Sequence, residues 1–277
     1  MSARSENMRL HKSVANIYGT DLDKTKKDIR KGQSRFAGFA LFSGNPFERI
    51  EGSFMESAYF AYGEVETEYL KSKDKRLAEV IERIGHIERE VDTDLFSAVI
   101  HHIIGQQIST KAQQSIWQKV KETLGEINAD TILSMERDRL QQLGMSFRKA
   151  DYIIDFADKV ANGTFDLEGI RSMSDADAIK SLSSLRGVGV WTAEMLLLFC
   201  LQRPNIFSFG DFGILRGIRM LYHHKEVDKE RFARYRKRFS PYCSVASLYL
   251  WAVAGGAIPE LCDYGISGSS LKNSSVD

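Results

Sequence analysis

Apolar residues recur at steps of three and four positions along most of the chain, and this spacing is typical of amphipathic α-helices. Between Leu95 and Leu124 the pattern predicts either one long helix or two helices in sequence. It returns further along the chain and predicts helices over the ranges 148–160, 178–185, 192–201, 212–222 and 244–253. Because no long stretch of this part alternates between apolar and polar positions, we expect a mainly α-helical fold.

The start and the end of the chain differ from this helical part in composition. Eight aromatic residues fall among glycines between Arg35 and Val65, which favours short strands and turns over a long helix. A reduced α+β region is one interpretation of this segment. The last residues are rich in Ser and Gly and are expected to fray. The sequence therefore predicts an N-terminal region over 1–68, a helical domain over 69–262 and a flexible tail over 263–277.

One helix start is predicted from a dipeptide. Ser240 is followed by Pro241, and the apolar residues Val245, Leu248 and Trp251 come next at helical spacing. A hydroxyl at the cap and a proline in the first turn are common at the beginning of a helix. We therefore expect a helix to begin at this pair.

Charge and cysteine content narrow the class of protein. The 38 basic and 37 acidic residues nearly cancel, so a nucleic acid could be bound only by a local basic patch. The three cysteines lie far apart and form neither a CxxC pair nor a disulfide framework, which favours a reducing compartment. The first 35 residues hold no apolar run long enough for a signal peptide or a membrane helix. We expect a soluble, intracellular protein with no membrane partner.

Two glycines separated by one residue interrupt the helical pattern near the middle of the chain. Gly187 and Gly189 would each cost about 1 kcal/mol inside a helix, so they indicate a tight turn between two helices. Val188 would then point into the core. The amides of Gly189, Val190 and Trp191 would open the next helix and could bind a phosphate. By spacing alone, an ordinary helix connection is as good an interpretation.

The residues around this turn resemble a known family. Leu185 to Ala193 (LRGVGVWTA) is similar to the helix-hairpin-helix of the DNA glycosylase superfamily, and Asp211 follows twenty positions after Trp191, at the end of FSFGD, as in that family's motif. Two further segments resemble the branch that excises alkylated bases, the 3-methyladenine DNA glycosylase II type: IGQQIS at 104–109 and LGMSFRKA at 143–150. A final match, FSPY at 239–242 running to Leu250 and Trp251, closes the domain. Arg186 departs from the family, which usually has proline there.

The resemblance implies that Asp211 is the catalytic carboxylate and that Trp191 and Trp251 line the base pocket. Read without the family, Asp211 is a helix N-cap and the tryptophans are core residues. A carboxylate would stabilise the positive charge that develops on the sugar as the base departs. An indole face would attract a cationic alkylated base, once that base is flipped out of the duplex, by about 1–2 kcal/mol.

The resemblance also implies contacts with double-stranded DNA. Gln107 occupies the position of the residue that fills the gap left by the flipped base, although an exposed polar residue is the simpler interpretation. The predicted DNA-binding residues are Gln107, Arg148, Lys149, Gly187, Gly189 and Trp191. Lys111 and the basic run from Arg231 to Arg238 could extend the local patch, or the run could be an ordinary solvated helix face.

Cofactors and subclass follow from the same resemblance. Relatives that also cut the DNA strand carry a catalytic lysine where this chain has Trp191, so we expect a monofunctional hydrolase that leaves an abasic site. Three scattered cysteines cannot hold the iron–sulfur cluster of other relatives. A structural monovalent cation could bind the backbone carbonyls of Ser183, Leu185 and Val188. We expect a monomer; a glycosylase for deaminated or oxidised bases and a non-catalytic DNA-binding protein remain the alternatives.

Overall fold

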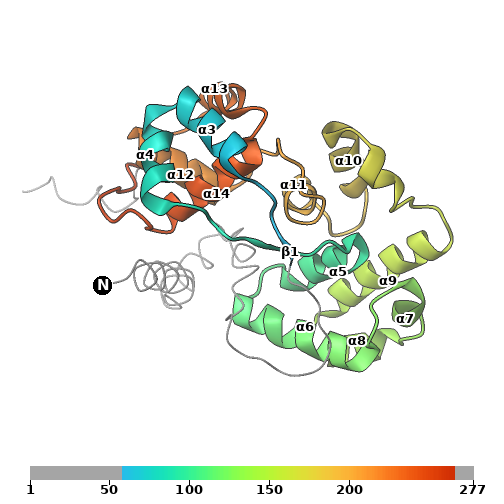
Figure 1. The fold of residues 1–277 in the computed structure, drawn as a ribbon. Coiled ribbons are helices and arrows are strands. Elements are labelled where there is room, and N and C mark those ends of the chain that lie inside the picture. The colour runs from blue at the N-terminus through green and yellow to red at the C-terminus, as the bar shows by residue number, and fades with distance from the viewer. Residues whose placement is uncertain (1–57, 266–277) are drawn as a thin grey trace, which may run out of the picture. The chain divides into compact units, whose positions relative to one another are not determined.

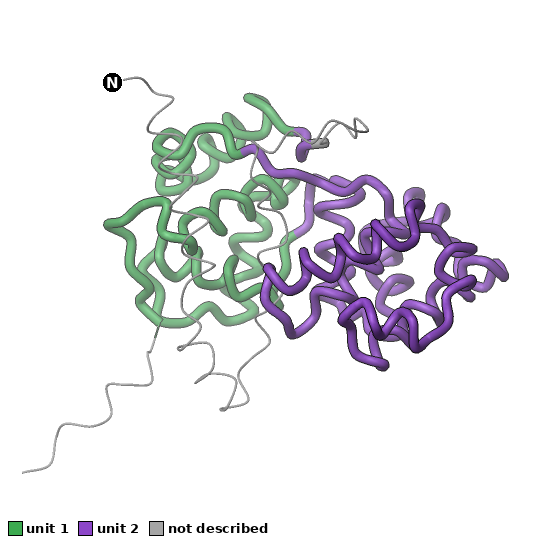
Figure 2. Tube along the Cα trace, turned by 90° about the horizontal axis from the view of Figure 1, so that it is seen from below, with its two compact units in different colours: residues 1–18, 62–87, 207–277 green, residues 19–61, 88–206 purple. Residues whose placement is uncertain are grey.

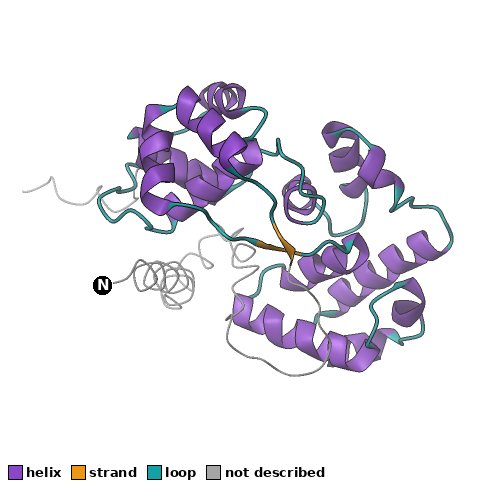
Figure 3. Cartoon of the chain, in the orientation of Figure 1, coloured by secondary structure: helices purple, strands orange, loops and turns teal. Residues whose placement is uncertain are grey.

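The computed structural model describes residues 58–265, and this part of the chain is mainly α-helical (Figure 1). Its two strands, β1 (Ala58–Tyr59) and β2 (Glu90–Val91), are short and pair antiparallel, with Ala58 opposite Val91. Helices account for nearly all other regular structure in the described part (Figure 3). The predictions made for residues 1–57 and 266–277 lie outside the described residues. None of the described helices is long and apolar enough to cross a membrane.

The described residues form two compact units (Figure 2). The first unit joins residues 62–87 to residues 207–265, so its halves are far apart in the sequence. The second unit contains residues 58–61 and 88–206. The predicted limits of the helical domain, 69 and 262, stay predictions.

Five helices make up the described part of the first unit: α3 (Glu64–Lys73), α4 (Lys75–Ile84), α12 (Phe212–Tyr222), α13 (Lys229–Phe239) and α14 (Cys243–Ala254). Helix α12 packs along α14, and α14 also contacts α4 and α3. Gly217 permits the close approach of α12 to α14, because a Cβ at this position would lie 2.3 Å from the carbonyl oxygen of Leu250. Asp74, Asp211 and Asp228 cap α4, α12 and α13 with their side chains.

The second unit is built around α5 (Leu95–Gly105), all of whose residues are buried. The other helical segments of this unit are α6 (Thr110–Leu124), α7 (Ala129–Leu133), α8 (Arg137–Gln142), α9 (Phe147–Ala161), η1 (Gly169–Ser172), α10 (Asp175–Leu182) and α11 (Val190–Phe199). Helices α6, α9 and α11 pack against α5, and α10 packs against α11. Because α5 is buried on every side, this unit is assembled around it rather than beside it.

Two buried histidines lie on α5. Burial, with a smaller contribution from the charge of Lys121, lowers the pKa of His101 to about 4. Burial and then the neighbouring His101 lower the pKa of His102 to about 3. The imidazole of His101 stacks on Trp117 with the ring centres 4.7 Å apart. Both histidines are therefore neutral parts of the core at pH 7.

The apolar pattern between Leu95 and Leu124 corresponds to two helices, α5 and α6, separated by residues 106–109. The range 212–222 coincides with α12, and the other predicted ranges differ from α9, α10, α11 and α14 by one to three residues at an end.

The predicted helix start at Ser240 is wrong. The Ser240 amide donates to the carbonyl of Arg236, so this residue ends α13 instead of beginning α14. Pro241 follows through a cis peptide bond and lies in a turn. Helix α14 begins at Cys243, and Tyr242 precedes it without a side-chain cap. The dipeptide has the composition of a helix start, but the turn at 240–241 and Tyr242 separate the serine from the first residue of α14.

Candidate active site and hairpin

Asp211 lies at the first turn of α12, with a side chain that is almost fully buried. Its Oδ1 atom accepts a hydrogen bond of 2.8 Å from the Ile214 amide, which confirms the N-cap that the sequence predicts. The same oxygen accepts a second bond of 2.9 Å from Nε1 of Trp251 on α14. Two donors on two helices therefore hold one carboxylate oxygen in place.

Trp251 is buried, as core packing requires, and its indole lies against the carboxylate that the family resemblance makes catalytic. Gly213 makes room for it, because a Cβ at that position would come within 2.7 Å of Trp251 Cδ1. The sequence indicated Asp211 and Trp251 separately. It showed neither the hydrogen bond between them nor the space that Gly213 leaves for the indole. Forty positions separate the two hydrogen-bonded residues, so no local pattern could show this contact.

The two predicted hairpin glycines lie in the turn between α10 and α11, and they differ in what they require. Gly187 has a φ of +83°, and a Cβ there would lie 2.3 Å from the Tyr152 ring. Gly189 has an ordinary extended conformation, caps α11 and has open space beside it. Val188 between them is buried, as predicted. Only Gly187 is therefore demanded by both its backbone conformation and its packing.

Side chains from α5 and α9 support this turn. Nε2 of Gln106 donates a 2.5 Å hydrogen bond to the carbonyl oxygen of Gly187. Arg186, which replaces the usual proline, lies over the Tyr152 ring at 5.4 Å and 3.8 Å from a carboxylate oxygen of Asp155. The guanidinium is therefore engaged with α9, although more than half of the side chain is exposed.

Trp191 is the second residue of α11, the helix that follows the hairpin. Its side chain is partly exposed and therefore accessible at the start of this helix. The three residues expected to offer carbonyls to a cation also lie in this turn. Ser183 ends α10, and the Leu185 carbonyl accepts a hydrogen bond from the Val188 amide. The Ser183 hydroxyl oxygen is buried and has no hydrogen-bond partner among the described residues. A polar ligand at this turn fits that observation.

Gln107 lies in the loop between α5 and α6, next to the residue that contacts the hairpin. Its φ is +57°, in the left-handed region that non-glycine residues rarely occupy, and its side chain is exposed. Such a conformation costs about 1–2 kcal/mol, and residues held in it cluster at functional sites. The sequence could not show this feature, since glutamine has no preference for that region.

The predicted basic residues have different surroundings. Arg148 is exposed near the start of α9. Lys149 donates from Nζ to the carbonyl oxygen of Ile104 at 2.7 Å, and burial lowers the pKa of its ammonium group. Lys149 therefore links α9 to the end of α5, and its contact with DNA stays a prediction.

The basic run on α13 is largely engaged within the first unit. Its members contact the carbonyls of Glu226 and Phe207 and the carboxylate of Asp74, through Arg231, Arg236 and Arg238. These bonds favour a structural role for the run over a nucleic-acid patch.

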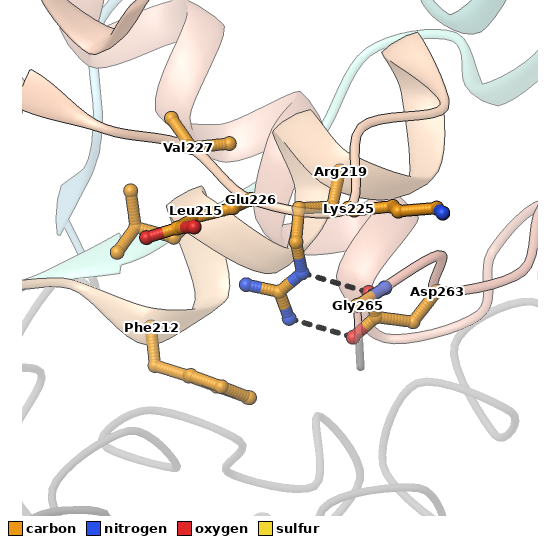
Figure 4. A pocket seen from close by; sticks show the side chains of 8 residues that line it. All are labelled: Phe212, Leu215, Arg219, Lys225, Glu226, Val227, Asp263 and Gly265. Carbon is orange, nitrogen blue, oxygen red and sulfur yellow. Dashed lines mark hydrogen bonds and ion pairs between the residues drawn. The ribbon is translucent and has the colours of Figure 1, made fainter. Parts of the chain in front are cut away.

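A cavity of about 570 Å³ opens in the first unit beside α12 (Figure 4). Arg219 and Asp263 both line it and form a two-pronged ion pair of 2.8 and 2.7 Å. Arg219 holds the pKa of the Asp263 carboxyl below its usual range. None of the predicted site residues lines this cavity. The Arg219–Asp263 ion pair attaches residue 263 to α12.

These features, a helical fold with a glycine hairpin and a buried aspartate at the start of a later helix, define a class of protein. The chain belongs to the HhH-GPD superfamily of base excision DNA repair proteins, whose sequence profile matches residues 100–241. The resemblance found in the sequence is thereby confirmed.

Among relatives, the protein YfjP of Bacillus subtilis, named provisionally as a DNA-3-methyladenine glycosylase, is 32% identical over 173 residues, covering 58% of this chain and 59% of that protein. The solved DNA-3-methyladenine glycosidase of Bacillus halodurans has a TM-score of 0.65 and 32% identity, covering 75% of this chain and 97% of the other. The 3-methyladenine DNA glycosylase of Schizosaccharomyces pombe, in complex with abasic DNA, has a TM-score of 0.60 and 25% identity. The match covers 68% of this chain and 95% of the other. The chain thus spans less than two thirds of the Bacillus subtilis relative.

Proposed function

We propose that this protein is a monofunctional DNA glycosylase that removes alkylated purines of the 3-methyladenine type from double-stranded DNA and leaves an abasic site. The observation that carries the proposal is Asp211, a buried carboxylate held by two N–H donors at the start of α12 in a member of the HhH-GPD superfamily. The names of the relatives from Bacillus and Schizosaccharomyces support the substrate class.

The chemistry needs little beyond this carboxylate. A purine alkylated on a ring nitrogen is already cationic, so the glycosidic bond breaks with its electron pair going to the base, which leaves as a neutral molecule. The sugar becomes oxocarbenium-like, and the Asp211 carboxylate stabilises that positive charge. Water then adds to the sugar carbon and gives up its proton, with the same carboxylate as the acceptor nearest the reaction.

Trp191 and the hairpin complete the proposed site. Trp191 stands where strand-cutting relatives carry lysine, so no Schiff base forms with the sugar and the product is an abasic site. The hairpin amides around Gly189 would contact a DNA phosphate at the start of α11. A monovalent cation, if bound by the carbonyls of Ser183, Leu185 and Val188, would hold the turn and take no part in the chemistry.

The test is release of bases from methylated duplex DNA by the intact protein and by Asp211→Asn. Asparagine is also a good N-cap, and its oxygen can accept the bonds from Ile214 and Trp251, so the substitution removes charge with little loss of structure. We expect base release to fall by about 10²–10³-fold or more, while binding to abasic DNA is retained. Free methylated purines separated by chromatography are the readout.

Asp228→Asn is the matched control, because Asp228 caps α13 in the same unit by accepting from the Arg231 amide. It should release bases at the wild-type rate. Full turnover by Asp211→Asn would overturn the assignment of the catalytic residue. If the intact protein binds DNA but releases no methylated purine, deaminated duplexes are the next substrate, and failure there would identify a non-catalytic DNA-binding protein.

A further inference from the structure

We infer that Gly213 and Trp251 are positioning residues for the Asp211 carboxylate: the indole N–H fixes the carboxylate, and the missing side chain at Gly213 allows the indole to reach it. This inference rests on the proposed function and assigns Trp251 a task besides any stacking on the base. It also assigns a task to a glycine that carries no chemical group of its own.

The first step of the argument is the geometry at Oδ1. The Ile214 amide approaches this oxygen from the first turn of α12, and Nε1 of Trp251 approaches it from α14. A carboxylate held by its helix cap alone can still turn about the bond to Cγ. A second donor from another helix opposes that rotation and so gives the other oxygen, Oδ2, a single direction.

The second step is the packing that places the indole. Helix α12 presents Gly213 and, one turn later, Gly217 to α14. A Cβ at Gly217 would collide with the backbone of Leu250, and a Cβ at Gly213 would lie 2.7 Å from Cδ1 and 3.1 Å from Nε1 of Trp251. The two glycines therefore let α14 lie close to α12 and set the indole at hydrogen-bonding distance from Asp211.

The third step is that Gly213 is not needed for the helix itself. It is a helical residue without a positive φ, so alanine would suit the backbone at least as well. What excludes a larger residue here is the hydrogen-bonded pair itself, because an added Cβ would press on the Trp251 indole and would also lie 3.3 Å from Oδ1 of Asp211. Gly213→Ala should therefore displace the indole while the protein stays folded.

Two substitutions separate positioning from base stacking. Trp251→Phe keeps an aromatic face and removes the N–H donor. Gly213→Ala keeps the whole indole and moves it. We expect each to lower the single-turnover rate of base release about 10- to 100-fold, with the affinity for abasic DNA within about 3-fold of wild type, because a misplaced catalytic group affects the reaction and not the binding. Trp117→Phe, on α6, is the matched control and should leave both quantities unchanged.

Indole N–H signals in ¹H–¹⁵N spectra give a readout independent of activity. The chain has three tryptophans, so Trp251→Phe and Trp117→Phe assign all three signals by elimination. We expect the Trp251 signal to move in Asp211→Asn and in Gly213→Ala, since both change the bond to the carboxylate, and the Trp191 signal to stay in place.

The outcomes distinguish this inference from the proposed function. An active wild-type protein whose two variants release bases at full rate, or whose Trp251 signal is unaffected by Asp211→Asn, would overturn the inference alone. A wild-type protein that releases no base from any damaged duplex would overturn the proposed function and the inference with it. The double variant adds a last check: because both changes break one contact, their effects should combine to less than the product of the two.

Discussion

Asp211 in the first unit and the hairpin with the Gln107 loop in the second unit are held in place by different means. Asp211 is buried, and side-chain and backbone donors from two helices fix it. Gln107 and Gly189 are exposed. Around them the structure relies on unusual backbone conformations, with φ of +57° at Gln107 and +83° at Gly187.

The difference fits the roles proposed for the two regions. A carboxylate that stabilises a developing charge works best where water is excluded and the group is already oriented. Groups that contact a phosphate backbone must remain at the surface, so their rigidity has to come from the main chain and from what lies beneath it. In the second unit that support is the fully buried α5 and the bond from Gln106 to Gly187.

The largest expected effect is a loss of stability at acid pH, where two buried histidines of α5 become protonated on unfolding. His101 and His102 have folded pKa values of about 4 and about 3, below the value of about 6.5 in an unfolded chain. Their contribution is therefore complete above pH 6.5 and is lost as the pH falls, because the unfolded state gains protons first. Each histidine should lower the free energy of unfolding by about 1.4 kcal/mol per pH unit between pH 6 and pH 4. Urea unfolding at several pH values measures this slope.

Two variants make the acid experiment specific. His101→Phe keeps a ring against Trp117 and should roughly halve the slope. Ile104→Val on the same helix is the control: it changes no titratable group, so it should cost about 0.5–1.5 kcal/mol at every pH and leave the slope unchanged. A stability that is constant from pH 6.5 to pH 4.5 would contradict the assignment of both buried histidines.

A smaller effect is expected from the hairpin glycines, which the sequence could not tell apart. Gly187→Ala should destabilise the protein by about 2–4 kcal/mol, from left-handed strain and from the collision with Tyr152. Gly189→Ala, the matched control in the same turn, should cost less than about 1 kcal/mol, because its φ is ordinary and no atom lies within 4 Å of the added Cβ. Thermal or urea unfolding of the two variants measures the two losses in stability. Equal losses would contradict the geometry of the turn.

The sequence predicted what depends on local spacing. The 3.6-residue period located most of the described helices, the glycine pair located the hairpin, and the polar residue before an apolar run identified Asp211 as an N-cap. Contacts between distant segments were beyond such patterns. The Trp251–Asp211 bond and the Lys149 bond to Ile104 depend on how helices pack. At Ser240 the local rule failed because the chain turns after α13, and α14 begins only at Cys243.

The smallest effect tests whether the Gln107 loop stores strain for a function. Glycine occupies the left-handed region at no steric cost, so Gln107→Gly should recover about 1–2 kcal/mol of strain and lose about half of it again to the greater freedom of the unfolded chain. We therefore expect a gain in stability of about 0.5–1 kcal/mol over Gln107→Ala, which removes the same side chain and keeps the strain. Both variants should release bases more slowly if this side chain fills the gap in the duplex. A glycine variant no more stable than the alanine variant would contradict the strained conformation. Full base release by both would show instead that this side chain does not fill the gap in the duplex.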